Sequence, residues 1–407
     1  MPPLKRVESA LRQATEFFAA QLASPGHRPP PWSEFEWTMA KAAAVLHGVT
    51  PLLATTLQWR GPAEWNQFLS DQHAHTLLRH RRIQALLLRI DEAARRENVS
   101  ALSLKGSALH ALGLYCAGQR PMADIDLLVE ERELDAMLRI LEGVDYRQTS
   151  ATWKHRILQP REHSSDASAQ AELAFGEHSD AEVKIELHTR IAERLPLLDV
   201  DATTCILPSD RRPGLNGYPS TAALFKHLLL HAAGNMVTRG LRLIHLHDIS
   251  LVAARMSEAE WAELLRSRVS QEALWWAVPP LELAARYYAN SVPSEVLEGL
   301  RPGCPRALRT ASRRQMLSDV SYAALRIETF PGLMWTDSLS EKLRCIQARV
   351  RPGPEQRAVH AVLQTERWNA SNGVVRRSFW RRGLEVLLTR PPRPAPMYIV
   401  RAAIRGR

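Results

Sequence analysis

The sequence predicts an α+β fold, in which a small mixed β-sheet lies between two helical regions of the chain. Three observations support this prediction. Apolar residues recur at helical spacing up to residue 97 and again after residue 207. Between these positions, short runs alternate apolar and polar residues, as half-buried strands do. The chain has 407 residues, more than one core usually contains, so we expect several subdomains. They are an N-terminal helical region at 1–97, an α/β core at 98–207, a C-terminal helical domain at 208–390 and a basic proline-rich tail at 391–407.

Prolines divide the first helical region. Pro31 marks a break before a second helix near Ser33, and Pro62 begins a long helix that ends before Asn98. The elements expected next are strands at 100–104, 124–129, 146–149, 153–158 and 183–188, helices at 107–115 and 132–141, and a surface loop at 160–180.

The second helical region begins near Pro219. A helix is expected at Leu243–Ala253, and tryptophans at 261, 275 and 276 indicate further helical core. The proline-rich run Pro391–Pro396 is expected to be extended.

The composition indicates an ordinary globular protein, with 45% hydrophobic and 24% charged residues. No apolar run approaches the roughly 18 residues needed to span a bilayer. The four cysteines lie far apart and form no Cys-x-x-Cys pair, which favours the reducing cytoplasm and argues against structural zinc. The sequence contains no P-loop, no dinucleotide-binding glycine motif and no Gly-x-Ser-x-Gly nucleophile turn.

Positive charge is concentrated near the C-terminus. Residues 376–407 contain nine arginines and one glutamate, which accounts for +8 of the net charge of +10. Such a stretch can attract RNA, an anionic membrane or an acidic partner, or it can simply be a solvated surface.

Two aspartates lie within an apolar run. Asp124 and Asp126 are two residues apart, so in a strand they share one face, and Ile125 and Leu127 share the other. Adjacent carboxylates repel each other, and a divalent cation such as Mg²⁺ or Mn²⁺ is the natural compensation. Relief of this repulsion predicts that Asp126→Asn keeps or raises stability in the metal-free protein.

A third acid follows the same pattern. In the run 183–188, Glu186 and His188 alternate with apolar residues, as expected for a half-buried strand. If this strand neighbours the Asp124–Val129 strand, three carboxylates meet, and such sets hold two metals in phosphoryl transfer. His188 shares the face of Glu186, so it either approaches the metal or the acceptor, or it orients a carboxylate.

A small-residue turn lies between the expected first strand and helix. Gly106 allows close approach, and backbone N–H groups at Ser107 favour phosphate, although Ser107 can also be a plain helix cap. Lys105 and Arg120 either neutralise phosphates or pair with the acids.

These motifs together resemble a known family. The order of Lys105-Gly106, then Arg120 to Val129, then Glu186-Leu187-His188, resembles the nucleotidyltransferase superfamily typified by DNA polymerase β. The finer pattern is similar to one bacterial branch, the uncharacterised nucleotidyltransferases (the NTP_transf_5 type). The resemblance covers roughly residues 35 to 255. The gap between Gly106 and Asp124 is longer than in most of the superfamily but suits this branch.

The resemblance implies a nucleotidyltransferase core and a transfer of NMP from an NTP, with ATP the expected donor, releasing pyrophosphate. Asp124, Asp126 and Glu186 would be catalytic and would bind Mg²⁺ or Mn²⁺. The residues expected to bind the nucleotide are Lys105, Gly106, Ser107 and Arg120. Because the branch is associated with biosynthesis of modified peptides or polysaccharides, a peptide or small-molecule acceptor is favoured. The alternatives are an RNA-tailing enzyme and a non-catalytic nucleotide-binding module.

Further polar residues lie in the second helical region. His227 and His231 are four residues apart, a spacing that can bind zinc but that also suits helix packing. The resemblance implies that His231 and Asp248 line the nucleotide or acceptor cleft.

Overall fold

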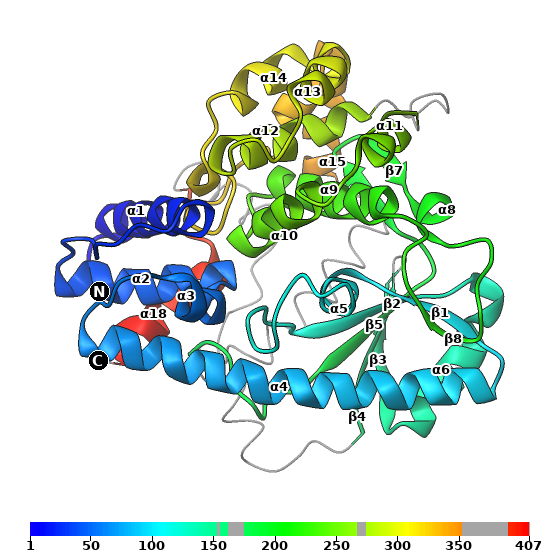
Figure 1. The fold of residues 1–407 in the computed structure, drawn as a ribbon. Helices are drawn as coiled ribbons and strands as arrows, with labels where there is room; N and C mark the ends of the chain where they lie inside the picture. The colour runs from blue at the N-terminus through cyan, green and yellow to red at the C-terminus, as the bar shows by residue number, and fades with distance from the viewer. Residues whose placement is uncertain (153–154, 162–174, 267–273, 352–389, 407) are drawn as a thin grey trace.

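The computed structural model describes residues 1–152, 155–161, 175–266, 274–351 and 390–406. It has the α+β architecture that the sequence predicts, with one six-stranded sheet and a separate two-stranded sheet (Figure 1). Most of the expected loop at 160–180, and the arginine-rich residues 376–389, lie outside the described residues.

Helices form most of the described structure. Their bounds are α1 Leu4–Ala23, α2 Glu34–His47, α3 Thr50–Thr56, α4 Ala63–Arg96, α5 Lys105–Ala111, α6 Leu134–Gly143, α8 Thr203–Ile206, α9 Thr221–Val237, α10 Leu243–Ala253, α11 Glu258–Arg266, α12 Val278–Tyr287, α13 Ser294–Leu300, α14 Arg306–Ser312, α15 Leu339–Val350 and α18 Pro394–Arg405. Local sequence explains both ends of α2: Ser33 and Glu36 form a capping box at its start, and Gly48 ends the helix in the left-handed conformation.

The strands are short. Their bounds are β1 Ser100–Ser103, β2 Asp124–Leu128, β3 Tyr146–Ala151, β4 His155–Pro160, β5 Lys184–His188, β6 Ala192–Leu195, β7 Leu198–Asp201 and β8 Gly214–Asn216. The large sheet has the order β3-β4-β5-β2-β1-β8, and β2 is parallel to β5 and antiparallel to β1. The sheet therefore continues past residue 207, because β8 pairs with β1. A three-residue strand is too short to show a period in the sequence.

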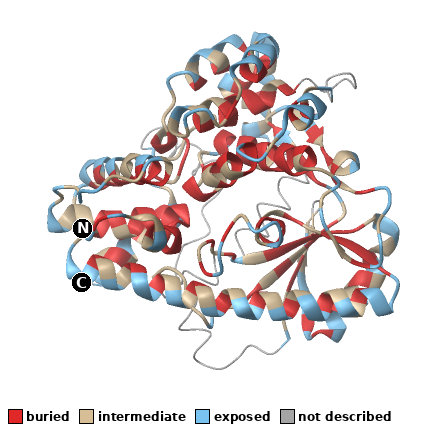
Figure 2. Cartoon of the chain, viewed as in Figure 1, coloured by how far each residue is buried: buried red, intermediate tan, exposed pale blue. Residues whose placement is uncertain are grey.

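One face of the large sheet is apolar and carries its own core. Ile125 and Leu127 of β2, with Ile185 and Leu187 of β5, pack against α4 and α6. Figure 2 shows the matching buried stripe along α4. The polar positions of β2 and β5 therefore lie on the opposite face, toward α5 and α9, as period-2 alternation predicts.

A second core joins the two ends of the chain. Buried apolar residues of α1 and α2 belong to one cluster with those of α9, α10, α12 and α18. His47 at the end of α2 links these parts, since its Nδ1 atom accepts a hydrogen bond from the backbone N–H of Leu243, 3.0 Å away. The N-terminal and C-terminal helices thus form one packed body.

The expectation of an extended tail at Pro391–Pro396 is wrong for its second half. α18 begins at Pro394 and packs on α2, with Met397 and Val400 buried. Proline suits the first turn of a helix, where its missing N–H costs nothing, and the apolar residues that follow recur at helical spacing.

Two further observations concern the chain as a whole. None of the described helices combines the length and the apolar composition needed to cross a bilayer. All four cysteines are free thiols.

Candidate functional site

The acids of β2 and β5 lie side by side on the polar face of the sheet. In the parallel pairing, Asp126 is directly opposite Glu186, and Asp124 precedes Asp126 by two residues on the same face. The condition that the two acid-bearing strands are neighbours is therefore met. Asp126 is buried, whereas Asp124 and Glu186 are half-buried.

A lysine and a histidine contact Asp126. The Nζ atom of Lys105 lies 2.8 Å from Asp126 Oδ1, and the Nε2 atom of His188 lies 3.0 Å from the same oxygen. His188 Nε2 is also 3.6 Å from Glu186 Oε2. Lys105 thus pairs with an acid in this structure, and His188 holds two carboxylates in place.

The charges shift one another's pKa values. Burial, together with repulsion from Asp126 and Glu186, raises the pKa of Asp124 to about 6. Burial alone would also raise the pKa of Asp126, but Lys105 and the hydrogen bond from His188 hold it well below its usual value. Although burial opposes protonation of His188, its contacts with the Asp126 and Glu186 carboxylates raise its pKa. The three carboxylates of the site carry more negative charge than its basic residues offset.

The Gly-Ser turn lies at the end of β1, beside these acids. Lys105 has a φ of +45°, a strained left-handed conformation for a residue with a side chain. A Cβ atom at Gly106 would lie 2.5 Å from Arg120 Nη1 and 2.9 Å from the Met122 side chain, so only glycine fits. The buried Ser107 Oγ atom has no hydrogen-bond partner among the described residues.

Arg120 lies in a buried ion pair. Its Nε and Nη2 atoms donate to the two carboxylate oxygens of Asp248 at 2.9 and 2.8 Å, and Tyr115 donates to Asp248 at 2.6 Å. Asp248 is only 1% exposed, so it lies behind Arg120 rather than on an open surface. Of the two roles open for Arg120, the structure shows pairing with an acid, on α10.

Histidines of α9 lie over the acid-bearing end of the sheet. His231 lines a small cavity of about 40 Å³ together with Lys105, His188 and His227. His227 is hydrogen-bonded to the Tyr218 hydroxyl at 2.7 Å, and that hydroxyl accepts from the Lys105 backbone N–H at 3.3 Å. His227 and His231 do not form a metal-ligand group among the described residues.

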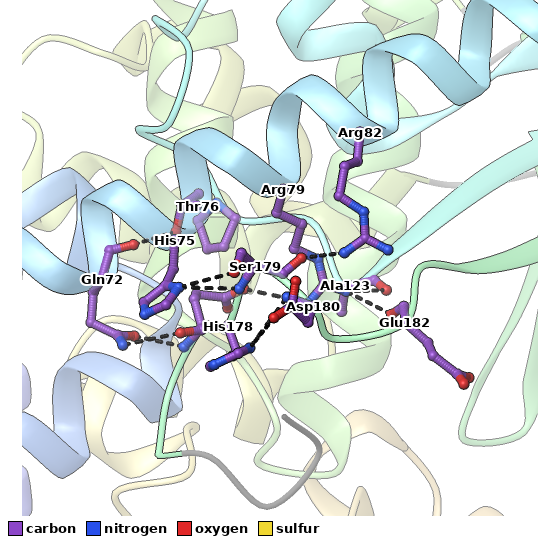
Figure 3. Close-up of polar contacts among 12 residues, drawn as sticks. Gln72, His75, Thr76, Arg79, Arg82, Ala123, His178, Ser179, Asp180 and Glu182 are labelled. Atoms are coloured by element: carbon purple, nitrogen blue, oxygen red, sulfur yellow. Dashed lines mark hydrogen bonds and ion pairs between the residues drawn. The ribbon is translucent and has the colours of Figure 1, made fainter. Parts of the chain in front are cut away.

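The helix α4 clamps the segment that leads into β5 (Figure 3). The Gln72 side chain both donates to the Glu177 carbonyl, at 3.1 Å, and accepts from the Glu177 N–H, at 2.6 Å. His75 accepts from the Ser179 N–H and stacks on His178 with ring centroids 4.7 Å apart. The approach to β5 is thus fixed by side-chain contacts to its backbone.

Arg79 of the same helix joins the starts of both acid-bearing strands. Its Nη2 atom donates to the Ala123 carbonyl at 3.1 Å and to the Glu182 carbonyl at 2.9 Å. Ala123 directly precedes Asp124, and Glu182 lies four residues before Glu186. Arg79 is only 5% exposed, so this contact is shielded from water, and it ties the starts of the two strands to α4.

Sequence reasoning did not single out Arg79, Tyr115 or His155. For Arg79 a signal was present, since a charged residue stands at a helical position within the apolar stripe of α4. His155 carries no such signal, because its place beside β5 depends on strand pairing. Tyr115 is also without such a signal, because its partner Asp248 lies 133 residues away in the sequence.

The residues present fit a divalent cation. Three carboxylates share one face, and no described side chain or backbone group makes a hydrogen bond or ion pair to the carboxylate of Asp124. Oxygen-only donors in this number suit Mg²⁺ or Mn²⁺. The unpartnered Ser107 hydroxyl lies at the adjoining turn and is a free polar group for a phosphate.

A mixed sheet with three acids beside a glycine turn is the arrangement implied by the resemblance stated above. The family model described as "Uncharacterised nucleotidyltransferase" matches residues 33–289, which is more than half of the chain. The chain therefore belongs to this nucleotidyltransferase family. No curated protein and no solved structure matches it.

Proposed function

We propose that this protein is a metal-dependent nucleotidyltransferase that transfers an NMP group, with ATP as the expected donor, to a peptide or small-molecule acceptor in natural-product or polysaccharide biosynthesis. The observation that carries the proposal is the register of β2 and β5, which puts Asp126 opposite Glu186 with Asp124 on the same face. The family supplies the reaction class.

In the reaction, an acceptor oxygen bonds to the α-phosphorus while the bond from that phosphorus to the bridging oxygen of pyrophosphate breaks. Glu186 would either bind the metal nearer the acceptor or take the acceptor proton. Ser107 donates to a phosphate oxygen, and Lys105, which precedes the turn, offsets phosphate charge. Divalent ions held by Asp124, Asp126 and Glu186 would supply charge neutralisation and alignment of the attacking and leaving oxygens.

His188 and Arg120 act on other residues in this proposal. His188 orients Asp126 through its hydrogen bond and lies 3.6 Å from the Glu186 carboxylate. Arg120 keeps the loop before β2 against α10, because both its Nε and Nη2 atoms are occupied by Asp248. His231 lines the cavity beside Lys105 and is the candidate for contact with the acceptor.

An RNA acceptor is the second candidate, favoured by the arginine-rich residues near the C-terminus. Counterion release would then make acceptor binding fall steeply with salt. A non-catalytic nucleotide-binding module is less favoured, because all three acids are present on one face.

The test is calorimetry of ATP and the other NTPs with Mg²⁺ or Mn²⁺, followed by assay of pyrophosphate release with candidate acceptors. We expect binding to require the metal and to be lost in Asp124→Asn. A wild-type protein that binds no NTP with either metal contradicts the proposal, as does unchanged pyrophosphate release in Asp124→Asn.

A further inference from the structure

One cluster on the sheet includes nitrogen ligands in addition to a carboxylate. His155 of β4 and Glu186 and His188 of β5 each place one potential ligand atom within 4.8 Å of the others. β4 and β5 are antiparallel neighbours, and His155 is opposite His188. Both imidazoles therefore project from the face that carries Glu186, with their ring centroids 5.1 Å apart.

Within the described part of the chain, no hydrogen bond uses the His155 ring. Its Nδ1 atom is buried and has no hydrogen-bond partner. The hairpin between β3 and β4 is held instead by backbone groups, since the His155 N–H donates to Thr152 Oγ1 and its carbonyl accepts from the Thr152 N–H. A buried imidazole nitrogen without a partner costs free energy unless a ligand uses the ring.

We propose that His155, Glu186 and His188 bind one divalent transition-metal ion of the Zn²⁺, Co²⁺ or Mn²⁺ class, which takes the place of the proton between His188 Nε2 and Asp126 in the metal-free structure. Imidazole nitrogens suit these metals, whereas Mg²⁺ prefers oxygen ligands alone. Three protein ligands leave a position open for water or a substrate oxygen, as in catalytic zinc sites. Any role of this ion in transfer rests on the proposed function, because Glu186 is shared with the catalytic acids. Binding of the ion does not depend on that function.

The two sides of the site are expected to prefer different metals. Asp124 and Asp126 offer oxygen only, while the side toward β4 offers two imidazoles and one carboxylate. Affinity of mixed nitrogen and oxygen sites rises from Mn²⁺ through Co²⁺, and Zn²⁺ also binds them well. We therefore expect a Zn²⁺ or Co²⁺ ion to remain bound in the presence of excess Mg²⁺.

The experiment is a Co²⁺ titration of the full-length, chelator-treated protein, followed by visible absorption. We expect one strong site in the wild-type protein that Zn²⁺ displaces and Mg²⁺ does not. His155→Ala should weaken Co²⁺ binding by about 100-fold or more, since even residues outside the ligand set cost 10–100-fold. Asp124→Asn, which lies outside the three ligands, should retain it.

The matched control is His27→Ala, which removes an exposed histidine remote from the cluster in sequence and should bind Co²⁺ like the wild type. Circular dichroism in chelator checks that each variant is folded. Wild-type Co²⁺ affinity in folded His155→Ala overturns the proposal, and so does loss of binding in Asp124→Asn with retention in His155→Ala.

A measurement on the wild type alone covers the case in which His155→Ala does not fold. X-ray absorption spectroscopy of the wild-type protein loaded with one equivalent of Co²⁺ in excess Mg²⁺ should detect imidazole ligands, and oxygen-only coordination of the Co²⁺ overturns the site. The two proposals fail separately. A protein that binds Co²⁺ through His155 but no NTP keeps the metal site and loses the nucleotidyltransferase function; Mg²⁺-dependent transfer with no nitrogen-coordinated metal does the reverse.

Discussion

Arg120, on the loop before β2, and Asp248, in the middle of α10, form a buried bidentate ion pair with N···O distances of 2.9 and 2.8 Å. It joins the acid-bearing sheet to the C-terminal helices. Tyr115 adds a third hydrogen bond to the same carboxylate. Because the pair is shielded from water, the loss of one partner leaves an uncompensated buried charge.

Asp248→Asn should therefore lower the free energy of unfolding by about 3–5 kcal/mol, measured by urea denaturation. Asp210→Asn, an exposed aspartate, is the control and should unfold like the wild type. Replacement of both partners by apolar residues, Arg120→Met with Asp248→Leu, should recover most of the loss. If this double variant is stable yet no longer binds NTP, Arg120 contacts phosphate after all.

The two aspartates of β2 should respond oppositely to loss of charge. Asp124→Asn removes a carboxylate that repels its neighbours, so stability in chelator should stay equal or rise. Asp126→Asn leaves Lys105 and His188 without their shared partner and should cost about 3 kcal/mol. Both variants should lose transfer. Thermal melts of both variants in chelator measure this difference in stability. Equal melting temperatures would contradict the inference that Asp126 is paired with cationic partners and Asp124 is not.

The effect expected here for Asp126→Asn is the opposite of the one expected from the sequence alone. Period-2 alternation correctly put Asp124, Asp126 and Glu186 on one face, because that rule depends only on neighbours in the chain. The cation that pairs with Asp126 comes from another element, 21 residues away. Asp248 lies 128 residues from Arg120, and His155 enters the site only through the β4–β5 register. Contacts of this kind depend on tertiary packing, which local patterns do not encode.

Arg79 should act on catalysis through the two strands that it joins. Arg79→Met removes the hydrogen bonds to the Ala123 and Glu182 carbonyls, so the starts of β2 and β5, and Asp124 with them, lose their anchor to α4. We expect kcat to fall by about 100-fold, the loss typical of a 1 Å misplacement, with a smaller change in the KM for NTP. Arg81→Met, on the exposed side of α4, is the control. Equal kcat values for both variants would leave Arg79 with a purely structural role.

His47 should make the protein sensitive to mild acid. The Thr15 hydroxyl donates to the Leu11 carbonyl and so accepts from His47 Nε2, while His47 Nδ1 accepts from Leu243. Both ring nitrogens are thus engaged by the neutral form. Burial, with the nearby Arg242, lowers the pKa of His47 from 6.5 to about 3.

The sign of the effect follows from proton uptake. Below pH 6.5 the unfolded chain binds a proton at His47, whereas the folded chain does not bind it until the pH falls to about 3. Stability is unaffected above pH 6.5 and falls by about 1.4 kcal/mol per pH unit below it. Urea unfolding of the wild type and His47→Gln, at pH 7.5 and 5.5, should give a smaller loss in the variant. Parallel pH profiles for the two proteins would exclude His47 as a source, and His27→Gln serves as the control.

The basic C-terminal helix should matter for stability rather than for the acceptor. Val400 of α18 is fully buried and packs in the core shared with α2, so Val400→Ala should cost about 2 kcal/mol. Deletion of residues 391–407 should therefore destabilise the protein and is a poor test of acceptor binding.

Arg401 and Arg405 are exposed on the same helix, so Arg401→Gln with Arg405→Gln removes charge and leaves the packing intact. With a peptide or small-molecule acceptor, this double variant should transfer NMP at near-normal rates at all salt concentrations. A fall in transfer that is largest at low salt would instead indicate RNA, because fewer counterions would be released on binding.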